Sequence, residues 1–316
     1  MENAVPVNIS NFIRAESDMY FQRYASNGAF GKFVHDRKGV DIDHQPIIRV
    51  NRDTPYSTGI FDLTVPVTIH KPDTGSRFQS MIVINEDHYI KLITYDAGEY
   101  TLTQEAMGTR YVVVLFRTLV DPSDPEDFQK IHAIMDQITA TQESPGTLEL
   151  PNWDSDSRDK LRAAILALGP FVSSSKGMFG DEDETEPVAH LIGTAAGWGG
   201  NPVEDALYLN VTPENQDGVT PYVLNITDVP VDGFWSISVY NRAGYFEKNP
   251  HDSYSLNQFT AQKSDDGSFT LRFGGDPTAP NFLNIMPGWN YCVRLYRPRR
   301  EILSGQWKFP VPVPAG

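Results

Sequence analysis

The sequence predicts a mainly β protein with several helices, arranged as two β-sandwich or jelly-roll-like domains joined by a helical segment. Short runs rich in Val, Ile, Phe and Tyr fill two blocks of the chain, and runs of helical period lie between them. The 23 prolines and 24 glycines suit a chain with many turns. We expect an N-terminal helix over 1–28, a first β-domain over 29–120, a helical linker with a glycine-rich loop over 121–202, and a second β-domain over 203–316.

The first block begins with a helix and continues as strands. Apolar side chains recur at spacings of three and four over residues 9–27, and Asn27-Gly28 ends the pattern. Residues 28–46 show no period and are expected to form a loop. Five strand candidates follow, separated by turn residues: 47–51, 57–65, 78–85, 88–96 and 111–119.

Two helices are expected between the blocks. Residues 124–140 open with Asp-Pro and repeat apolar side chains at helical spacing, and residues 156–168 end at Gly169-Pro170. Residues 173–202 are expected to be a loop whose glycines around Trp198 serve as a flexible lid or for close backbone packing. No nucleotide-binding fingerprint is present there.

The second block holds the clearest strand pattern in the chain. After the Asp232-Gly233 turn, Trp235 and its alternate neighbours form an apolar face, while Ser236, Ser238 and Tyr240 form the opposite one. We expect the apolar face in a core and the polar face beside a ligand. The strand candidates of this block are 205–212, 221–229, 233–241, 253–260, 268–275, 282–286 and 290–298.

Composition excludes several classes of partner. The net charge of −15 and the pI near 4.8 disfavour nucleic acid and anionic membranes. No apolar run approaches the ~20 residues of a transmembrane segment. The N-terminus carries no secretory signal, which predicts a cytoplasmic protein as given, or a secreted or periplasmic one if the chain is a mature form. The single cysteine, Cys292, forms no internal disulfide and is expected to be a buried thiol.

Long motifs in both blocks resemble known families. NRDTPYSTGIFDL (51–63), followed by the Arg117 strand, resembles the bacterial and viral "domain of unknown function 1254". GWGGNP (197–202), the stretch 231–256, DDGSFTLRF (265–273) and the stretch 294–314 resemble "domain of unknown function 1214". The resemblance implies a two-domain, mostly β protein, but it brings no agreed activity and no catalytic residues to carry over.

The loop after the first strand candidate is the first candidate site. Asn51 to Ser57 is dense in hydrogen-bonding groups, and it presents Arg52 and Asp53 to a ligand with Tyr56 as a stacking or acid group. The structural alternative is that Asp53 caps the turn before Pro55 while Arg52 pairs with a carboxylate.

Two arginines lie inside apolar strands. Arg117 and Arg294 each carry a charge that must be paired or must face a ligand, because an unpaired buried charge costs several kcal/mol. A ligand carboxylate or phosphate suits a guanidinium fork. An internal partner such as Asp53 or Asp62 suits it equally well.

The remaining candidates are His88 and two aromatic residues. His88 begins a strand beside two acids and is a candidate general base, with an ordinary strand-end histidine as the alternative. The histidines show no metal-ligand spacing, so we name no metal site, and no cofactor is identified. Trp198 and Tyr240 are the aromatic candidates for lining a pocket.

Two hypotheses for function follow. The first is a protein that binds, and in its further form processes, a small organic molecule or glycan in a cleft between the two β-domains. Asp53, Tyr56 and His88 would be catalytic, and the ligand would be held by Arg52, Arg117, Trp198, Tyr240 and Arg294. The second is a non-catalytic binding or assembly module, in which the arginines form internal salt bridges. A homo-oligomer is compatible with both hypotheses.

Overall fold

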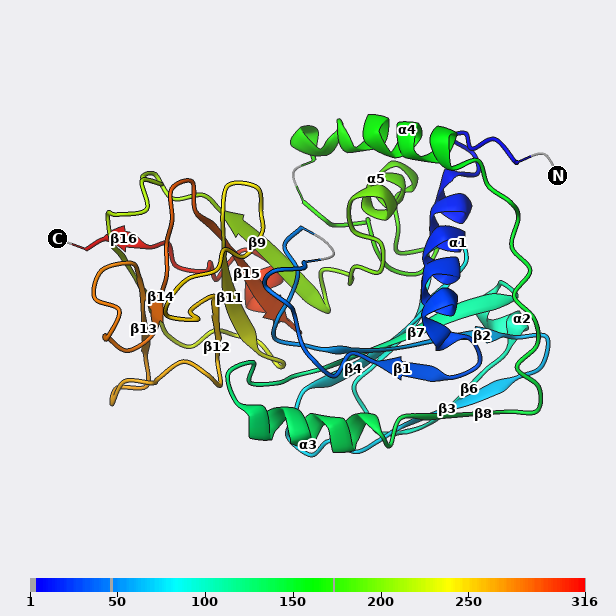
Figure 1. Cartoon of the computed structure of the whole chain (residues 1–316), viewed down its shortest axis with the longest axis horizontal. Helices are drawn as coiled ribbons and strands as arrows, with labels where there is room; N and C mark the ends of the chain where they lie inside the picture. The colour runs from blue at the N-terminus through cyan, green and yellow to red at the C-terminus, as the bar shows by residue number, and fades with distance from the viewer. Residues whose placement is uncertain (1–3, 46–47, 173, 316) are drawn as a thin grey trace. The chain divides into compact units, whose positions relative to one another are not determined.

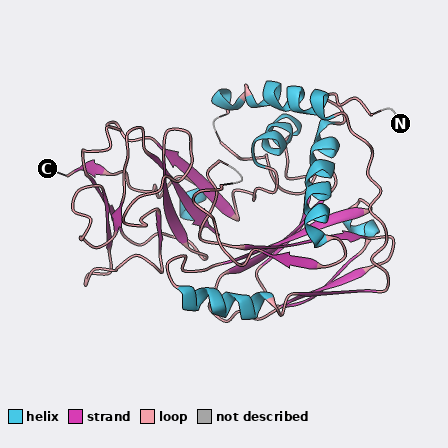
Figure 2. Cartoon of the chain, in the orientation of Figure 1, coloured by secondary structure: helices cyan, strands magenta, loops and turns pink. Residues whose placement is uncertain are grey.

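The computed structural model describes residues 4–45, 48–172 and 174–315. Within these residues the protein is mainly β, with strands β1 to β16 in four sheets and helices α1 to α6 (Figures 1 and 2). The predicted fold class is confirmed. Chain contacts define two compact units. Unit 1 comprises residues 1–37, 56–119 and 128–202, and unit 2 comprises residues 38–55, 120–127 and 203–316.

Unit 1 contains an antiparallel five-stranded sheet. Its spatial order is β1 (Phe33–His35), β2 (Tyr56–Asp62), β7 (Tyr111–Thr118), β4 (Gln79–Asn85) and β5 (Ile90–Thr94). Successive side chains of β7 enter two different cores, because the sheet is covered on both faces. This explains why the strand reads as a continuous apolar run rather than as an alternation.

One face of this sheet carries helices, and the other carries a second sheet. Helices α1 (Phe12–Tyr24), α4 (Ser155–Leu166) and α5 (Pro187–Gly197) share an apolar core with one face (Figure 1). The other face shares a core with the three-stranded sheet of β6 (Gly98–Leu102), β3 (Val67–Lys71) and β8 (Thr139–Gln142). The short helix α2 (Gln104–Met107) lies between β6 and β7 along the chain, and α3 (Pro125–Met135) follows β7.

Unit 2 is a sandwich of two four-stranded sheets. The first contains β12 (Ser255–Asn257), β11 (Trp235–Tyr240), β15 (Asn290–Tyr296) and β9 (Ala206–Val211). The second contains β14 (Phe282–Leu283), β13 (Phe269–Phe273), β10 (Tyr222–Ile226) and β16 (Val313–Pro314), and α6 (Arg300–Leu303) follows β15. Trp235, Ile237 and Val239 lie in the core that both sheets share. The apolar face of β11 is therefore buried as expected.

Several expected elements differ in the structure. The strand expected over 47–51 is wrong, because residues 48–49 form a turn in which Arg49 has φ 54°; Ile47 lies outside the described residues. The expected loop 28–46 contains β1, and π-helical residues Ala25–Ala29 extend α1. The end of the expected helix 124–140 pairs as β8 instead. Within the expected loop 173–202, an apolar run opened by Pro187 forms α5, with Ser173 outside the described residues.

Candidate functional site

The polar face of the β11–β15 pair is a buried surface in unit 2. Ser236 and Ser238 of β11 lie opposite Arg294 and Cys292 of β15, and Tyr240 follows on the same face of β11. All five residues are at most 3% exposed. A sheet face this polar requires hydrogen-bond partners from elsewhere in the unit.

A segment of unit 2 from far earlier in the chain supplies many of these partners. Arg294 donates from Nη2 to the Arg49 carbonyl and to the Tyr240 hydroxyl, both at 2.8 Å, and from Nη1 to Ser238 Oγ at 3.0 Å. Tyr240 in turn donates to the Val50 carbonyl at 2.9 Å. Asn51 donates from Nδ2 to the Tyr296 hydroxyl at 2.9 Å. We call residues 48–54 the strap, and it holds Arg294 and Tyr240 through protein atoms.

Asp53 is the carboxylate that the strap brings to this face. Its side chain is fully buried and accepts a hydrogen bond from Asn257 Nδ2 at 3.0 Å through Oδ1. Burial raises the pKa of Asp53, against the opposing effects of Asn257, Arg294, Ser236 and Arg52. The Ser236 hydroxyl lies beside this carboxyl and favours its ionised form. Asp53 Oδ2 and Ser236 Oγ are both buried and have no other hydrogen-bond partner in the described part of unit 2.

Arg49 and Arg52 add two further guanidinium groups beside this face. Arg52 lies over the rings of Tyr254 and Phe246, at 4.8 and 5.9 Å from their centroids, and Arg49 lies over Tyr240 at 5.6 Å. Neither side chain makes an ion pair or a hydrogen bond with any residue that the structure describes, and Arg49 Nη1 is buried. Burial lowers the pKa of Arg52, although a guanidinium of this kind stays charged.

The strap and sheet therefore collect more positive than negative charge. Arg294 and Arg52 both act on the carboxylate of Asp53, Asp252 also acts on Arg52, and Arg49 adds a third guanidinium over Tyr240. Such an excess at partly or fully buried positions is costly unless an anion or water compensates it. This arrangement has the donors and the charge to bind a carboxylate or phosphate group.

His88 lies in unit 1 and has both ring nitrogens engaged. Thr194 donates its hydroxyl to the His190 carbonyl at 2.8 Å, so it accepts from His88 Nδ1, also at 2.8 Å. His88 Nε2 accepts from the Gly199 N–H at 2.9 Å. This pattern assigns the neutral Nδ1–H tautomer to His88. Burial and the neighbouring His190 hold the pKa of His88 well below its ordinary value.

Arg117, Tyr56 and Trp198 lie around the same glycine-rich segment. Arg117 donates to the Gly199 carbonyl at 2.7 Å and to Asn201 Oδ1 at 3.2 Å, and its guanidinium lies 5.3 Å from the Tyr56 ring centroid. The Trp198 ring stacks on His88, and its indole N–H donates to Ser17 Oγ at 3.0 Å. Arg117 thus donates to the carbonyl of Gly199, and His88 accepts from the N–H of the same glycine.

The predicted site residues therefore fall into two groups, one in each unit. Unit 2 brings together Arg52, Asp53, Tyr240 and Arg294; unit 1 brings together Tyr56, His88, Arg117 and Trp198. In the unit 1 group, the polar atoms of His88 and the Trp198 indole N–H are directed at protein partners. In the unit 2 group, the Arg52 guanidinium has no hydrogen-bond partner in the described residues, and Asp53 Oδ2 has none beyond the neighbouring Ser236 hydroxyl.

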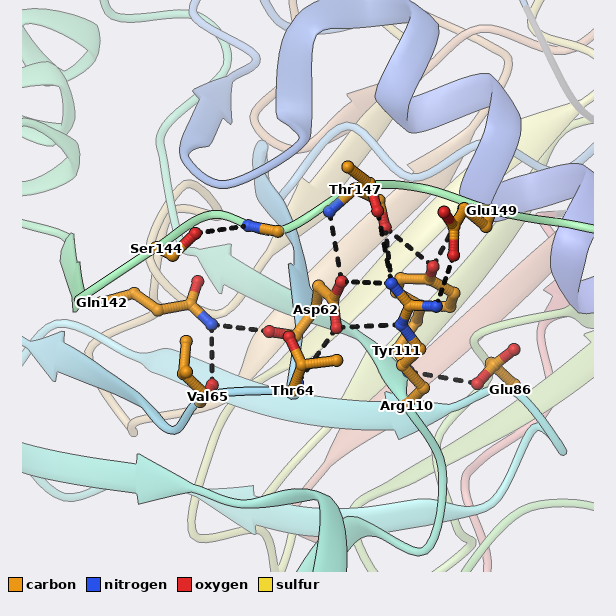
Figure 3. A network of polar contacts seen from close by, with 11 residues as sticks. Asp62, Thr64, Val65, Glu86, Arg110, Tyr111, Gln142, Ser144, Thr147 and Glu149 are labelled. Atoms are coloured by element: carbon orange, nitrogen blue, oxygen red, sulfur yellow. Dashed lines mark hydrogen bonds and ion pairs between the residues drawn. The ribbon is translucent and has the colours of Figure 1, made fainter.

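Asp62, which we considered as an internal partner for the strand arginines, pairs with a different arginine. Arg110 donates a bidentate pair of hydrogen bonds to Asp62, from Nε to Oδ1 at 3.1 Å and from Nη2 to Oδ2 at 2.8 Å (Figure 3). Burial acts to raise the pKa of Asp62, but the bonds from Arg110 and from the N–H groups of Thr64 and Thr147 outweigh it and lower that pKa. This network joins the end of β2 to the segment after β8 and has a structural role.

Sequence reasoning missed Arg49, Asn257 and Asp18. Arg49 had a signal, since it lies two residues before the polar loop that begins at Asn51. Asp18 had none: it occupies a buried position of α1, where it accepts a hydrogen bond from the Trp153 indole at 2.7 Å. Burial raises the pKa of Asp18 to about 6, against that bond.

No cluster of three or more His, Cys, Asp or Glu side chains in the ranges 4–45, 48–172 and 174–315 is arranged to hold a metal ion. No helix in those ranges is both long enough and apolar enough to cross a bilayer.

Comparisons with known proteins define the class as a two-domain, mainly β protein. Residues 30–142 match the family described as protein of unknown function DUF1254, and residues 207–300 match protein of unknown function DUF1214. The chain belongs to the family that pairs these two domains in this order, as its motifs implied. The DUF1254 match includes the strap, although the strap belongs to unit 2 by its contacts.

Two solved structures share the fold. The VPA0106 protein from Vibrio parahaemolyticus aligns with a TM-score of 0.75 at 17% identity, over 98% of each chain. An uncharacterised protein from Burkholderia cenocepacia aligns with a TM-score of 0.53 at 13% identity, over 92% of this chain and 84% of that one. At these identities the similarity concerns the fold alone.

Proposed function

We propose that unit 2 binds a small organic anion on the polar face of the β12-β11-β15-β9 sheet. Arg49 and Arg52 hold the anionic group, with Asp53 and the serines of β11 beside them. The observation that carries the proposal is the pair of guanidinium groups, which have aromatic rings beneath them and make no ion pair or hydrogen bond with the described residues. The proposed set of ligand-binding residues is smaller than the one expected from the sequence, because Arg294 and Tyr240 hold the strap rather than the ligand.

The groups that support chemistry on such a ligand are few. Asp53 is the buried carboxyl of this face, and its raised pKa suits proton transfer nearer neutral pH than an ordinary carboxyl. Tyr240 is less suited to act as an acid, because its proton is directed at the Val50 carbonyl. Binding is therefore the function proposed, and catalysis would rest on Asp53.

A non-catalytic module is the second candidate, and one observation favours it. Arg294 donates to Ser238, Tyr240 and the Arg49 carbonyl, and Arg117 donates to Gly199 and Asn201. Both strand arginines thus hold the protein's own segments in place. Under this candidate, Arg49 and Arg52 would be surface-facing charges whose removal changes no binding.

Isothermal titration calorimetry separates the two candidates. Benzoate, glucuronate and citrate would be titrated into the full chain and into Arg49→Ala and Arg52→Ala variants. Arg300→Ala is the matched control, since Arg300 is an exposed arginine of the same unit. We expect at least one anion to bind, with at least a ~10-fold loss of affinity in each strap variant. Anion affinities that are unchanged in both variants, or an absence of binding by every anion, would reject the proposal.

A further inference from the structure

We infer that His190 of α5 is a pH-operated latch within unit 1. With both ring nitrogens protonated, it holds residues 175–186, which we call the acidic segment, and the turn between β4 and β5 at the same time. When the ring loses one proton, one of these two attachments is lost. The inference goes beyond the proposed function and does not depend on it. It comes from the two hydrogen-bond acceptors that the His190 ring contacts.

Both ring nitrogens of His190 contact backbone carbonyl oxygens. Nδ1 lies 3.0 Å from the Met178 carbonyl oxygen, and Nε2 lies 3.0 Å from that of Asp87. A carbonyl oxygen accepts hydrogen bonds and never donates them, whereas a neutral imidazole has a single N–H. In a neutral ring, one nitrogen lone pair would therefore face a carbonyl lone pair at a position that is 2% exposed. Only the imidazolium form donates to both oxygens.

The rings that stack on His190 suit a cation. The Tyr89 ring lies 4.8 Å from it between centroids, with 8° between the planes, and an aromatic face attracts positive charge. The His88 ring also stacks on it, at 5.3 Å. His88 is neutral, because its Nε2 accepts from the Gly199 N–H. It therefore places no like charge beside His190.

The charged groups on the elements packed against α5 are mostly acidic. Two acids of these elements have close cationic partners: Asp87 pairs with Arg14 at 2.6 Å, and Asp181 pairs with Lys91 at 2.7 Å. Acids outnumber bases in the full set from α1, α4, the β4–β5 turn with β5, and the acidic segment, which contains Glu16, Asp18, Glu86, Asp87, Asp156, Asp159, Asp181, Glu182, Asp183, Glu184 and Glu186 against Arg14, Arg23, Lys91, Arg158, Lys160, Arg162 and Lys176. This balance favours the protonated ring.

The acidic segment covers an edge of the five-stranded sheet. Strand β5 is an edge strand of that sheet, and the Ile90 N–H at its start donates to the Gly180 carbonyl at 2.9 Å. An edge strand exposes unpaired backbone groups unless another segment covers it. The bond from His190 to the Met178 carbonyl holds this cover in place.

The second attachment holds a turn with an unusual backbone. His88 lies in the β4–β5 turn with φ 63°, a conformation that is uncommon for residues other than glycine and that persists where the surroundings fix it. The bond from His190 to the Asp87 carbonyl is one of those fixing contacts. Loss of one ring proton therefore weakens either the cover of β5 or the turn that precedes it.

The direction of the pH effect follows from the proton count. A histidine of an unfolded chain loses its second proton near pH 6.5, at about its ordinary pKa. In the folded chain two acceptors and the surrounding acids hold that proton more tightly, so the folded state binds more protons than the unfolded one. The stability that the latch provides is therefore complete below about pH 6.5 and is lost as the pH rises through the value at which the folded ring deprotonates.

Nitrogen NMR of the full chain, labelled with ¹⁵N in its histidines, tests the protonation state. Protonated and unprotonated ring nitrogens resonate far apart, so an imidazolium shows two nitrogens of the protonated kind. We expect this pattern for His190 at about pH 7.5, where an ordinary histidine is largely neutral, and a change of one nitrogen at higher pH. The signal is identified by its loss in a His190→Gln variant or by a nuclear Overhauser contact with Tyr89. His88 is the internal reference, with one protonated nitrogen throughout.

Hydrogen exchange tests whether the latch holds the acidic segment. The Ile90 amide is the reporter, because its N–H donates to the Gly180 carbonyl. Its protection is expressed relative to the unfolded chain. Between about pH 6 and pH 9, we expect this protection to fall at least ~10-fold more in the parent than in His190→Gln, whose amide side chain does not titrate. His251→Gln, at an exposed histidine of unit 2, is the matched control and should behave as the parent does.

Two outcomes overturn the inference. The first is a His190 ring with one unprotonated nitrogen at about pH 7.5. The second is an equal loss of Ile90 protection in the parent and in His190→Gln, because another titrating group such as Asp18 would then cause it. If circular dichroism shows that His190→Gln does not fold, the parent alone decides: its Ile90 protection must fall over the pH range in which the His190 ring changes. Neither measurement involves anion binding, so failure of the proposed function leaves the latch standing.

Discussion

Arg117 in unit 1 and Arg52 in unit 2 both place a guanidinium group against a tyrosine ring, at 5.3 and 4.8 Å from the centroid. Arg117 also donates to Gly199 and Asn201, so its hydrogen-bonding capacity serves the fold. Arg52 donates to no described residue. The comparison shows that a buried arginine in an apolar sequence does not by itself indicate a binding site. What distinguishes the two is whether the N–H groups have protein partners.

The largest effect on stability is expected at Arg294. An Arg294→Met variant loses the bonds to Ser238, Tyr240 and the Arg49 carbonyl, and it leaves Asp53 without its nearest strand cation. We expect a loss of ~3–5 kcal/mol in the free energy of unfolding, as when one partner of a buried charge network is removed. Urea denaturation measures this loss, with Arg300→Ala as a control that should change stability by less than ~0.5 kcal/mol. A small loss for Arg294→Met would mean that the strap contributes little to unit 2.

Arg117→Met tests the structural half of the comparison. The substitution leaves the Gly199 carbonyl without its donor while keeping the apolar stem, so we expect a loss of ~2–4 kcal/mol. Anion affinity measured on the folded variant should not change. A variant with ordinary stability and weakened anion binding would reverse the roles that the comparison assigns to the two arginines.

Asp18, a buried carboxyl in α1 of unit 1, should make the stability of the protein depend on pH. Its pKa is raised to about 6 from an ordinary value of 3.8, so the folded state holds this proton more tightly than the unfolded chain. The stability that the protonated carboxyl provides is complete below about pH 4 and is lost as the pH rises through about 6. An Asp18→Asn variant, which keeps an acceptor for Trp153, should be more stable than the parent by ~2–3 kcal/mol at pH 7.5.

The control for this prediction is the same pair of proteins at pH 4, where the difference should nearly vanish. Thermal unfolding followed by circular dichroism at both pH values gives the result. An advantage of equal size at both pH values would show that burial of the ionised carboxyl is not its cause.

The smallest effect on stability is expected at Arg52. Arg52→Met loses ring contacts but no hydrogen bond, so the free energy of unfolding should change by less than ~1 kcal/mol. Anion affinity should nevertheless fall at least ~10-fold. Denaturation and calorimetry on one preparation measure both quantities. A large stability loss without any change in binding would place Arg52 in the same structural class as Arg117.

The sequence predicted local features better than distant partnerships. The alternation over Trp235 to Tyr240 identified a strand and its core face, because side-chain direction has a period of two. The apolar run at 47–51 was misleading, since Arg49 takes a positive φ where a strand was expected. The partner of Arg294 could not be found at all, because its Arg49 carbonyl lies 245 positions away along the chain. Spacing carries no information about such a contact.

The segment 38–55, which contains the strap, has a consequence for how this chain can be engineered. Residues 38–55 fall within the DUF1254 match, yet their hydrogen bonds to Tyr240, Arg294, Asn257 and Phe246 complete the unit that contains the DUF1214 match. The two sequence domains are therefore not interchangeable cassettes. A chimera that joins the first half of one relative to the second half of another should fold well only if residues 38–55 travel with the second half.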